Sequence, residues 1–396
     1  MRFRRLPVVV VALATLAAPG LACGNDESKA APQLHVSVDP AAMRTPRQWT
    51  APTVARTTAG ASVAVFRSST PGTPPARIRL RGVGFAAVGK GAGHPYVTTG
   101  VDSRYTSINH GTYVASIGLT GRSVRLVIWS RGGQWRAKVD GRYVRTAPQS
   151  VGSDYALHTI GLDLGPGSEG RPHHVDFELR NGAHIAGVQV GQGDRLWLAG
   201  ASRRPRIYWL GDSFFAGAYA RYPGFDDLVH QTSSALGLND VTVDALGGTG
   251  YVKGNQVTRW PSFAQRVLAN IGRGRAQPDV IVVGGSINDT GYGTGIVRAA
   301  AARVFAELRR RASHAKVVAV TFGASFPVSA GLRTAIAGVD EAARAAPNVI
   351  GTVDLASELN AGNVARMVTK DGHPTAAAHR VYARELTRFL RNHGVR

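Results

Sequence analysis

The chain has 396 residues, which is enough for two domains that each bury a hydrophobic core. Hydrophobic residues make up 44% of the sequence, and this ordinary share excludes wholesale disorder. The formal net charge is +22, but the basic residues are scattered, which is typical of solvated surfaces rather than of one binding segment.

The first 23 residues resemble an export signal. Arg2, Arg4 and Arg5 precede an apolar stretch at 8–16 that is too short to span a membrane. Cys23 is the only cysteine, and its place after this stretch resembles a bacterial lipoprotein attachment site, with ordinary signal cleavage as the alternative. We therefore expect an exported protein, either secreted or a lipoprotein of the cell envelope. An anionic wall or membrane surface is a candidate partner. We expect no nucleic-acid partner.

Residues 24–52 are small and polar, include several prolines and show no apolar period, which is typical of a flexible linker. From 53 to 200, short apolar stretches are separated by glycine-rich turns, and none has a helical period. Asp140-Gly141 lies between two such stretches and favours a hairpin turn. We expect an accessory domain that is an all-β, jelly-roll-like sandwich.

After an arginine-rich hinge, residues 205–396 change to strands that alternate with helices. The predicted strands are 206–210, 241–246, 279–283, 316–321 and 349–353. The predicted helices are 226–236, 262–271, 296–312, 332–345 and 376–392. This order predicts an α/β fold with a doubly wound, parallel, five-stranded sheet, in which ligands bind at the carboxyl ends of the strands.

The first two predicted strands end in candidate functional motifs. Gly211-Asp212-Ser213 follows the first strand, where the serine hydroxyl would lie at the edge of the sheet. The N-terminus of the helix that follows this turn would direct backbone N–H groups and its dipole to an oxyanion. A glycine-rich stretch at 247–250 follows the second strand, where the backbone can approach a substrate closely. Alone, each motif is also typical of a helix cap or a plain turn.

Two further motifs follow later strands. The Asn288 amide can donate to an oxyanion, and Asp289 is expected to brace the loop, although the pair alone is also typical of an Asx turn. His373 precedes the last helix, and an imidazole that titrates near neutrality is a suitable base for a serine. Pro374 fixes that loop. His379 is the nearest rival, and we expect it to pack or cap.

In chain order, these motifs resemble those of the SGNH (GDSL-type) hydrolase superfamily, over about residues 205–392. The resemblance implies a serine esterase in which Ser213 is the nucleophile and His373 is the general base, then the acid that protonates the leaving alcohol. It implies an oxyanion hole made of the N–H groups of Ser213 and Gly250 and the side chain of Asn288. Asp212 is not expected to transfer a proton. No cofactor and no metal are expected.

The position of the acid departs from this family. The family usually has an aspartate three residues before the histidine, whereas Asp371 lies only two residues before His373. A carboxylate at this spacing can still reach Nδ1 if the turn differs, and a backbone carbonyl is the alternative partner. We take Asp371 as the acid that orients His373.

A jelly roll followed by an SGNH domain resembles the layout of the enzymes in carbohydrate esterase family two. These enzymes are polysaccharide deacetylases. This layout implies an exported esterase that hydrolyses small acyl esters, above all O-acetyl esters, of polysaccharide or cell-wall glycan through an acyl-enzyme. One alternative is a lipase, lysophospholipase or thioesterase in which Phe214 and Phe215 contact the acyl chain. Another is a wall-binding lipoprotein without activity. Hydrolysis and acyl transfer to another acceptor both fit these motifs.

Overall fold

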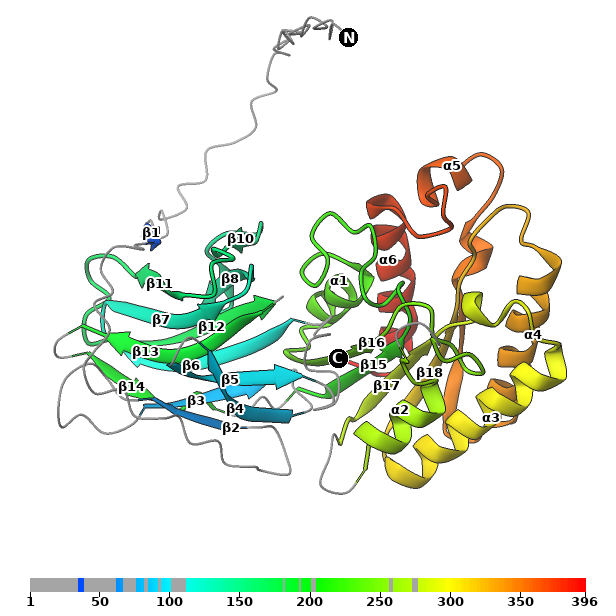
Figure 1. Cartoon of the computed structure of the whole chain (residues 1–396), viewed down its shortest axis with the longest axis horizontal. Helices are drawn as coiled ribbons and strands as arrows, with labels where there is room; N and C mark the ends of the chain where they lie inside the picture. Colours follow the sequence, from blue (N-terminus) through cyan, green and yellow to red (C-terminus); the bar gives the residue numbers. More distant parts are fainter. Residues whose placement is uncertain are drawn as a thin grey trace, which may run out of the picture.

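A computed structural model describes five strands between residues 35 and 100, and residues 112–396 apart from 181, 192–193, 201–203, 256–258 and 273–276. A β domain and an α/β domain lie side by side (Figure 1). The expected export signal, Cys23 and most of the expected linker lie outside the described residues. Within the described part, no helix is long and apolar enough to cross a membrane.

The β domain consists of two antiparallel sheets. The first has the order β1 (His35–Val38), β11 (Leu157–Asp163), β7 (Ser123–Ser130), β13 (Ala183–Val190), β5 (His94–Gly100) and β4 (Phe85–Gly91). The second has the order β10 (Gln149–Ser150), β8 (Gln134–Val139), β12 (Pro172–Arg180), β6 (Tyr113–Thr120), β3 (Ala76–Arg81) and β2 (Ser62–Phe66). The short strands β9 (Arg142–Tyr143) and β14 (Arg195–Trp197) pair with β8 and β6. The expectation of a β-sandwich is confirmed.

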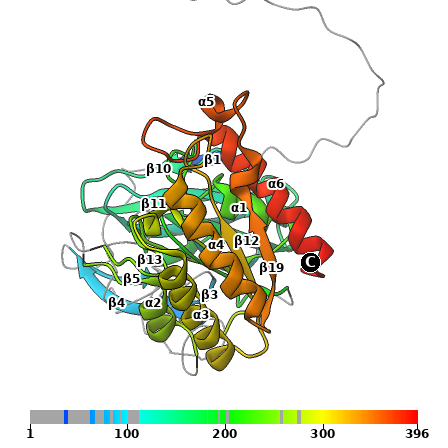
Figure 2. The same ribbon diagram turned by 90° about the vertical axis from the view of Figure 1, so that its right-hand side faces the viewer.

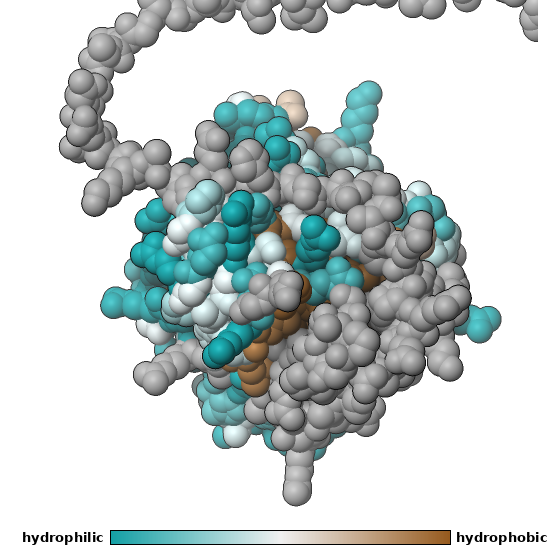
Figure 3. Space-filling view, turned by 90° about the vertical axis from the view of Figure 1, so that its left-hand side faces the viewer, coloured by the Kyte–Doolittle hydropathy of each residue, from teal (hydrophilic) through white to brown (hydrophobic). Residues whose placement is uncertain are grey.

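Alternation along the strands builds the core of the sandwich. On β6, Ala115, Ile117 and Leu119 face the other sheet and are fully buried. Val175 and Phe177 on β12 join the same core. Seen from the sandwich side, the described surface is mostly hydrophilic, with one apolar band across it (Figure 3).

The α/β domain has one parallel sheet of five strands. Its order is β16 (Asp240–Ala245), β15 (Arg206–Gly211), β17 (Val280–Gly284), β18 (Lys316–Thr321) and β19 (Val349–Asp354). The helices are α1 (Leu228–Ala235), α2 (Phe263–Asn270), α3 (Thr294–Arg311), α4 (Ala330–Ala345), α5 (Val364–Met367) and α6 (Ala376–Asn392). The predicted fold class is therefore confirmed, with α5 as a short addition.

Helices cover both faces of this sheet (Figure 2). On β15, Ile207 and Trp209 point to the core shared with α1 and α6. Tyr208 and Leu210 point to the core shared with α2, α3 and α4. Because both faces of β15 are buried, the strand is a continuous apolar run, which is typical of a parallel sheet.

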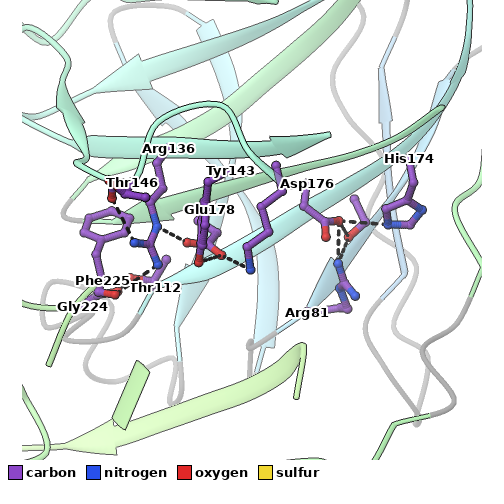
Figure 4. Close-up of polar contacts among 12 residues, drawn as sticks. Arg81, Thr112, Arg136, Tyr143, Thr146, His174, Asp176, Glu178, Gly224 and Phe225 are labelled. Carbon is purple, nitrogen blue, oxygen red and sulfur yellow. Dashed lines mark hydrogen bonds and ion pairs between the residues drawn. The ribbon is translucent and has the colours of Figure 1, made fainter. Parts of the chain in front are cut away.

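A polar face of the sandwich packs against the α/β domain. Arg81, Arg136, Asp176 and Glu178 are each at least nine-tenths buried, although they point away from the sandwich core. Figure 4 shows that these side chains pair with one another, Arg81 with Asp176 at 2.5 Å and Arg136 with Glu178. A cavity of about 40 Å³, large enough for a few water molecules, separates them from α1 and β16. The two domains therefore meet through paired charges rather than through an apolar interface.

Candidate active site

β15 brings Ser213 to the carboxyl edge of the sheet, immediately after Asp212. The segment that follows forms tight turns, in which the Ala218 N–H donates to the Ser213 carbonyl at 3.0 Å. Gly217 and Tyr219 have positive φ angles of 77° and 60°, which interrupt a right-handed helix. The helix predicted at 226–236 follows these turns as α1, which begins at Leu228.

Ser213, His373 and Asp371 form a connected chain of polar contacts. The Ser213 Oγ lies 3.0 Å from His373 Nε2, across 160 positions of sequence. His373 Nδ1 lies 3.1 Å from Asp371 Oδ2. With the proton on Nδ1, the imidazole donates to the carboxylate and accepts from the serine hydroxyl. This is the geometry that a serine nucleophile and its base require.

Asp371 reaches the imidazole from an exposed position at the start of a tight turn. Gly372 occupies the left-handed region with φ of 82°, which lets the chain turn back within two residues. Hydrogen bonds from the Thr369 and Tyr219 hydroxyl groups lower the pKa of Asp371 to about 2. The carboxylate is therefore ionised at neutral pH and can orient the Nδ1–H of His373.

Asp289 braces the glycine-rich loop after β16, as we expected from its place beside Asn288. Its carboxylate accepts from the backbone N–H groups of Tyr251, Val252 and Lys253 at 2.8, 3.2 and 3.0 Å. Burial raises the pKa of this carboxyl group, although the three donors oppose the shift. The loop beside the nucleophile is therefore fixed by a buried acid.

Gly250 has a different role from the one that the family resemblance implies. Its N–H donates to the Lys253 carbonyl at 2.7 Å, so it is not a free oxyanion donor in this structure. A methyl group on Gly250 would lie 2.4 Å from a carboxylate oxygen of Asp289. The absence of a side chain at Gly250 thus allows Asp289 to reach the loop, and its assignment to the oxyanion hole is corrected.

Gly247, in the same glycine-rich loop, lies beside the nucleophile. A methyl group on Gly247 would lie only 3.6 Å from Cβ of Ser213. In the described part of the chain, the N–H groups of Ser213, Gly247 and Gly248 donate to no protein acceptor. The Asn288 amide donates to the Thr249 carbonyl at 2.9 Å and to Asp212 Oδ2 at 3.2 Å. To bind an oxyanion, this amide must release one of these two acceptors.

Asp212 supports the site without contacting the imidazole. It is fully buried, and its Oδ1 accepts from the Phe214 N–H at 2.9 Å. Burial raises the pKa of Asp212 to about 7. Its bond to Asn288 joins the turn that carries the nucleophile to the end of β17.

Arg266 on α2 was missed by our sequence analysis, although it ties together three segments behind the site. Only 1% of this residue is exposed, and it forms an ion pair with Asp244 at 2.9 Å. It also donates to the Gly211 carbonyl at 2.8 Å and to Thr249 Oγ1 at 3.2 Å. The sequence signal that could have indicated this role was an arginine on the apolar face of a predicted helix, next to Val267.

His379, Phe214 and Phe215 belong to the core. His379 is fully buried, accepts from the Leu228 N–H at 3.2 Å, and contacts the Ala218 carbonyl through Nε2 at 2.9 Å. It therefore packs and caps α1, as expected. Phe214 and Phe215 are at most 2% exposed and pack against Phe322, so the idea that they contact an acyl chain was wrong.

The described residues contain no group of three or more histidine, cysteine, aspartate or glutamate side chains that could hold a metal ion. His173 and His174 instead contact Asp140 and Asp176 at 2.8 and 3.1 Å. The chemistry that the described site can perform is that of the Ser213 hydroxyl and the His373 imidazole.

Comparison with known families identifies the α/β domain. Residues 209–381 match the model of the GDSL-like lipase/acylhydrolase family. This match spans Ser213, Asn288 and His373, and it confirms the predicted family resemblance and the predicted class of carboxylic ester hydrolase. No curated protein sequence matches the chain.

Solved structures share the two-domain fold at low sequence identity. A family two carbohydrate esterase from Clostridium thermocellum is 20% identical with a TM-score of 0.54, and the match covers 72% of this chain and 93% of that one. A family two esterase from Corynascus thermopiles (Myceliophthora fergusii) is 18% identical with a TM-score of 0.55, covering 71% and 94%. A salicylyl-acyltransferase from a tetracycline biosynthetic pathway is 17% identical with a TM-score of 0.61, covering 83% and 98%. At these identities, the likeness shows the fold alone.

Proposed function

We propose that this chain, whose residues 209–381 form a GDSL-like acylhydrolase domain, is an exported esterase that removes small acyl groups, above all acetyl, from polysaccharide or cell-wall glycan. The observation that carries the proposal is the 3.0 Å contact between Ser213 Oγ and His373 Nε2, with Asp371 behind the imidazole.

The reaction proceeds through an acyl-enzyme. His373 Nε2 takes the hydroxyl proton as Ser213 Oγ attacks the ester carbonyl, and Asp371 accepts from the Nδ1–H of the resulting imidazolium. The same imidazolium protonates the leaving sugar hydroxyl. His373 then takes a proton from water as the water attacks the acyl-enzyme, and it returns this proton to Ser213 Oγ as the C–O bond breaks and the acid leaves. The free N–H group of Ser213 binds the oxyanion in both steps, together with the Asn288 amide once it has released one of its two acceptors.

Two features support a short acyl group on a glycan. Phe214 and Phe215 are buried beneath the site, so these two aromatic rings supply no apolar channel for a long acyl chain. The two-domain layout is also that of family two carbohydrate esterases, and the Clostridium thermocellum enzyme was solved in complex with cellohexaose.

The test compares acetate release from acetylated polysaccharides and from O-acetylated peptidoglycan by the wild type and by Ser213→Ala. The wild type should release acetate, and kcat of Ser213→Ala should fall at least about 1,000-fold. Ser357→Ala, which removes an exposed serine of the same domain, is the matched control and should behave as wild type. Equal release by all three proteins would refute the function.

A series of p-nitrophenyl esters separates the competing activities. Activity that falls steeply from acetate to octanoate supports the glycan deacetylase. A preference for octanoate would favour a lipase, lysophospholipase or thioesterase. Glycan binding without turnover of any ester would favour a non-catalytic wall-binding protein.

Acyl transfer is a second candidate, because the salicylyl-acyltransferase shares the fold over most of both chains. Adding a sugar alcohol to the p-nitrophenyl acetate assay measures how the acyl-enzyme partitions between water and the acceptor. A dominant ester product would assign the chain to transfer.

Export and lipidation at Cys23 are part of the proposal and rest on the sequence of the first 23 residues. In a bacterial host, labelled palmitate should be incorporated into the wild type and not into Cys23→Ser. A secreted product of the same mass from both would favour ordinary signal cleavage.

A further inference from the structure

Tyr219 lies on the nucleophile's own loop and reaches across to the loop of the acid and base. Its hydroxyl donates to Asp371 Oδ2 at 2.6 Å. Its ring lies over the His373 imidazole, with the ring centres 5.4 Å apart and the planes tilted by 39°. A single side chain thus contacts both members of the acid–base pair.

The Asp371 carboxylate needs such a partner because about half of its side chain is exposed to solvent. A carboxylate in this position can rotate away from the imidazole into water at little cost. The Thr369 hydroxyl holds Oδ1, and the Tyr219 hydroxyl holds the same Oδ2 that faces His373 Nδ1. The shortened Asp-Gly-His spacing leaves the Asp371 carboxyl group near the surface. The hydrogen bond from Tyr219 therefore fixes the rotation of this group.

The backbone segments on either side of Tyr219 determine where its side chain lies. It is 56% exposed and has a φ of 60°, a conformation that is uncommon for residues with a side chain. On its N-terminal side, the Ala218 carbonyl contacts buried His379 at 2.9 Å. The preceding and following segments therefore determine where the phenol ring lies.

The sandwich anchors the other side of this segment. Three consecutive carbonyls, at positions 223–225, accept hydrogen bonds from Arg180, Thr112 and Arg136 of the β domain. Figure 4 shows Thr112 and Arg136 reaching Gly224 and Phe225. The accessory domain thus fixes the loop that begins at the nucleophile and carries Tyr219.

We propose that Tyr219 is a positioning residue that holds Asp371 and His373 in register with Ser213, from a loop that the sandwich anchors. This inference deepens the proposed esterase function and rests on it. Tyr219 transfers no proton and acts only through Asp371.

The experiment uses the full chain, p-nitrophenyl acetate and the variants Tyr219→Phe, Asp371→Asn and their combination. Tyr219→Phe keeps the ring over His373 and removes only the hydroxyl group. We expect kcat to fall about ten-fold, the factor that loss of a hydrogen bond to a charged group commonly produces, with KM within about two-fold. In the Asp371→Asn background, the same substitution should change kcat by less than about two-fold.

Tyr222→Phe is the matched control, because Tyr222 lies in the same loop and its hydroxyl group makes no hydrogen bond in the described structure. It should leave kcat unchanged, and thermal melting should show that all variants fold. The inference is overturned if Tyr219→Phe retains kcat within about two-fold of wild type. It is also overturned if the ten-fold loss persists beside Asp371→Asn, or if Asp371→Asn itself leaves kcat unchanged.

The rate of labelling of Ser213 by a fluorophosphonate provides a readout that needs no substrate. It should fall about ten-fold in Tyr219→Phe and remain at the wild-type rate in Tyr222→Phe. If the wild type hydrolyses no ester, the proposed function fails, but this labelling rate still decides whether Tyr219 supports the nucleophile. An equal labelling rate in the wild type and Tyr219→Phe would overturn the inference alone.

Discussion

Replacing Arg266 with methionine tests whether the buried arginine holds the site together. Methionine is unbranched and of similar length, so it removes the charge and the donors while leaving a small cavity. The guanidinium group donates four hydrogen bonds, of 2.8–3.2 Å, to Asp244, Gly211 and Thr249. All of these contacts are buried, so water does not replace them without local opening.

The expected loss of stability in Arg266→Met follows from the buried groups that the substitution leaves without their partner. Asp244 would keep its contacts with Tyr208 at 2.7 Å and Asn270 at 3.0 Å, but its charge would lose the buried cation. Removing one partner of a buried ion pair costs about 3–5 kcal/mol. Typical domains are stable by about 5–15 kcal/mol, so the loss is a large fraction of the total. We also expect kcat to fall, because the Gly211 carbonyl lies two residues before Ser213.

Urea unfolding followed by tryptophan fluorescence measures the stability, and p-nitrophenyl acetate measures the activity. The matched control is Arg298→Met, which removes an exposed arginine whose ion pair with Glu341 spans 3.2 Å. That pair should contribute at most about 1 kcal/mol. If both variants unfold within about 1 kcal/mol of the wild type, Arg266 does not have the structural role that its contacts indicate.

Three further substitutions have defined outcomes. In Gly250→Ala, the new methyl group displaces the Asp289 carboxylate, so we expect a loss of about 2–4 kcal/mol by urea unfolding, and an unchanged midpoint would contradict this. Asp212→Asn tests a carboxyl group whose pKa is raised from 3.8 to about 7: its contribution to stability is complete below about pH 4 and is lost as the pH rises through about 7. The fall in the free energy of unfolding over this range should therefore be smaller in the variant, and identical pH profiles would refute the assignment. Arg136→Met leaves Glu178 with Lys138 as its remaining cation, so we expect about 2–4 kcal/mol of destabilisation and earlier proteolytic cleavage between the domains, whereas wild-type protease resistance would speak against it.

The sequence predicted the elements of the α/β domain closely, because each depends on a local apolar period. β18 and the end of α6 lie where the pattern placed them. The parallel arrangement of the strands followed from the alternation of strands and helices. These features are encoded within short windows of sequence, which is why they could be predicted.

The details of the site depend on contacts between distant residues and could not be predicted in this way. Gly250 looked like an oxyanion donor, but its N–H is engaged by Lys253 and its Cα faces Asp289, which lies 39 positions away. Tyr219 and Arg266 follow no motif, because their roles arise only when loops from several strand ends meet.

β16 is an edge strand of the parallel sheet, and this limits how the two domains can be separated. An uncovered outer strand invites pairing with other chains and promotes aggregation. Here β3 of the sandwich lies against β16. The GDSL-like region produced alone would present this margin to solvent and should precipitate. Exchange of the sandwich for an unrelated module would expose the same strand.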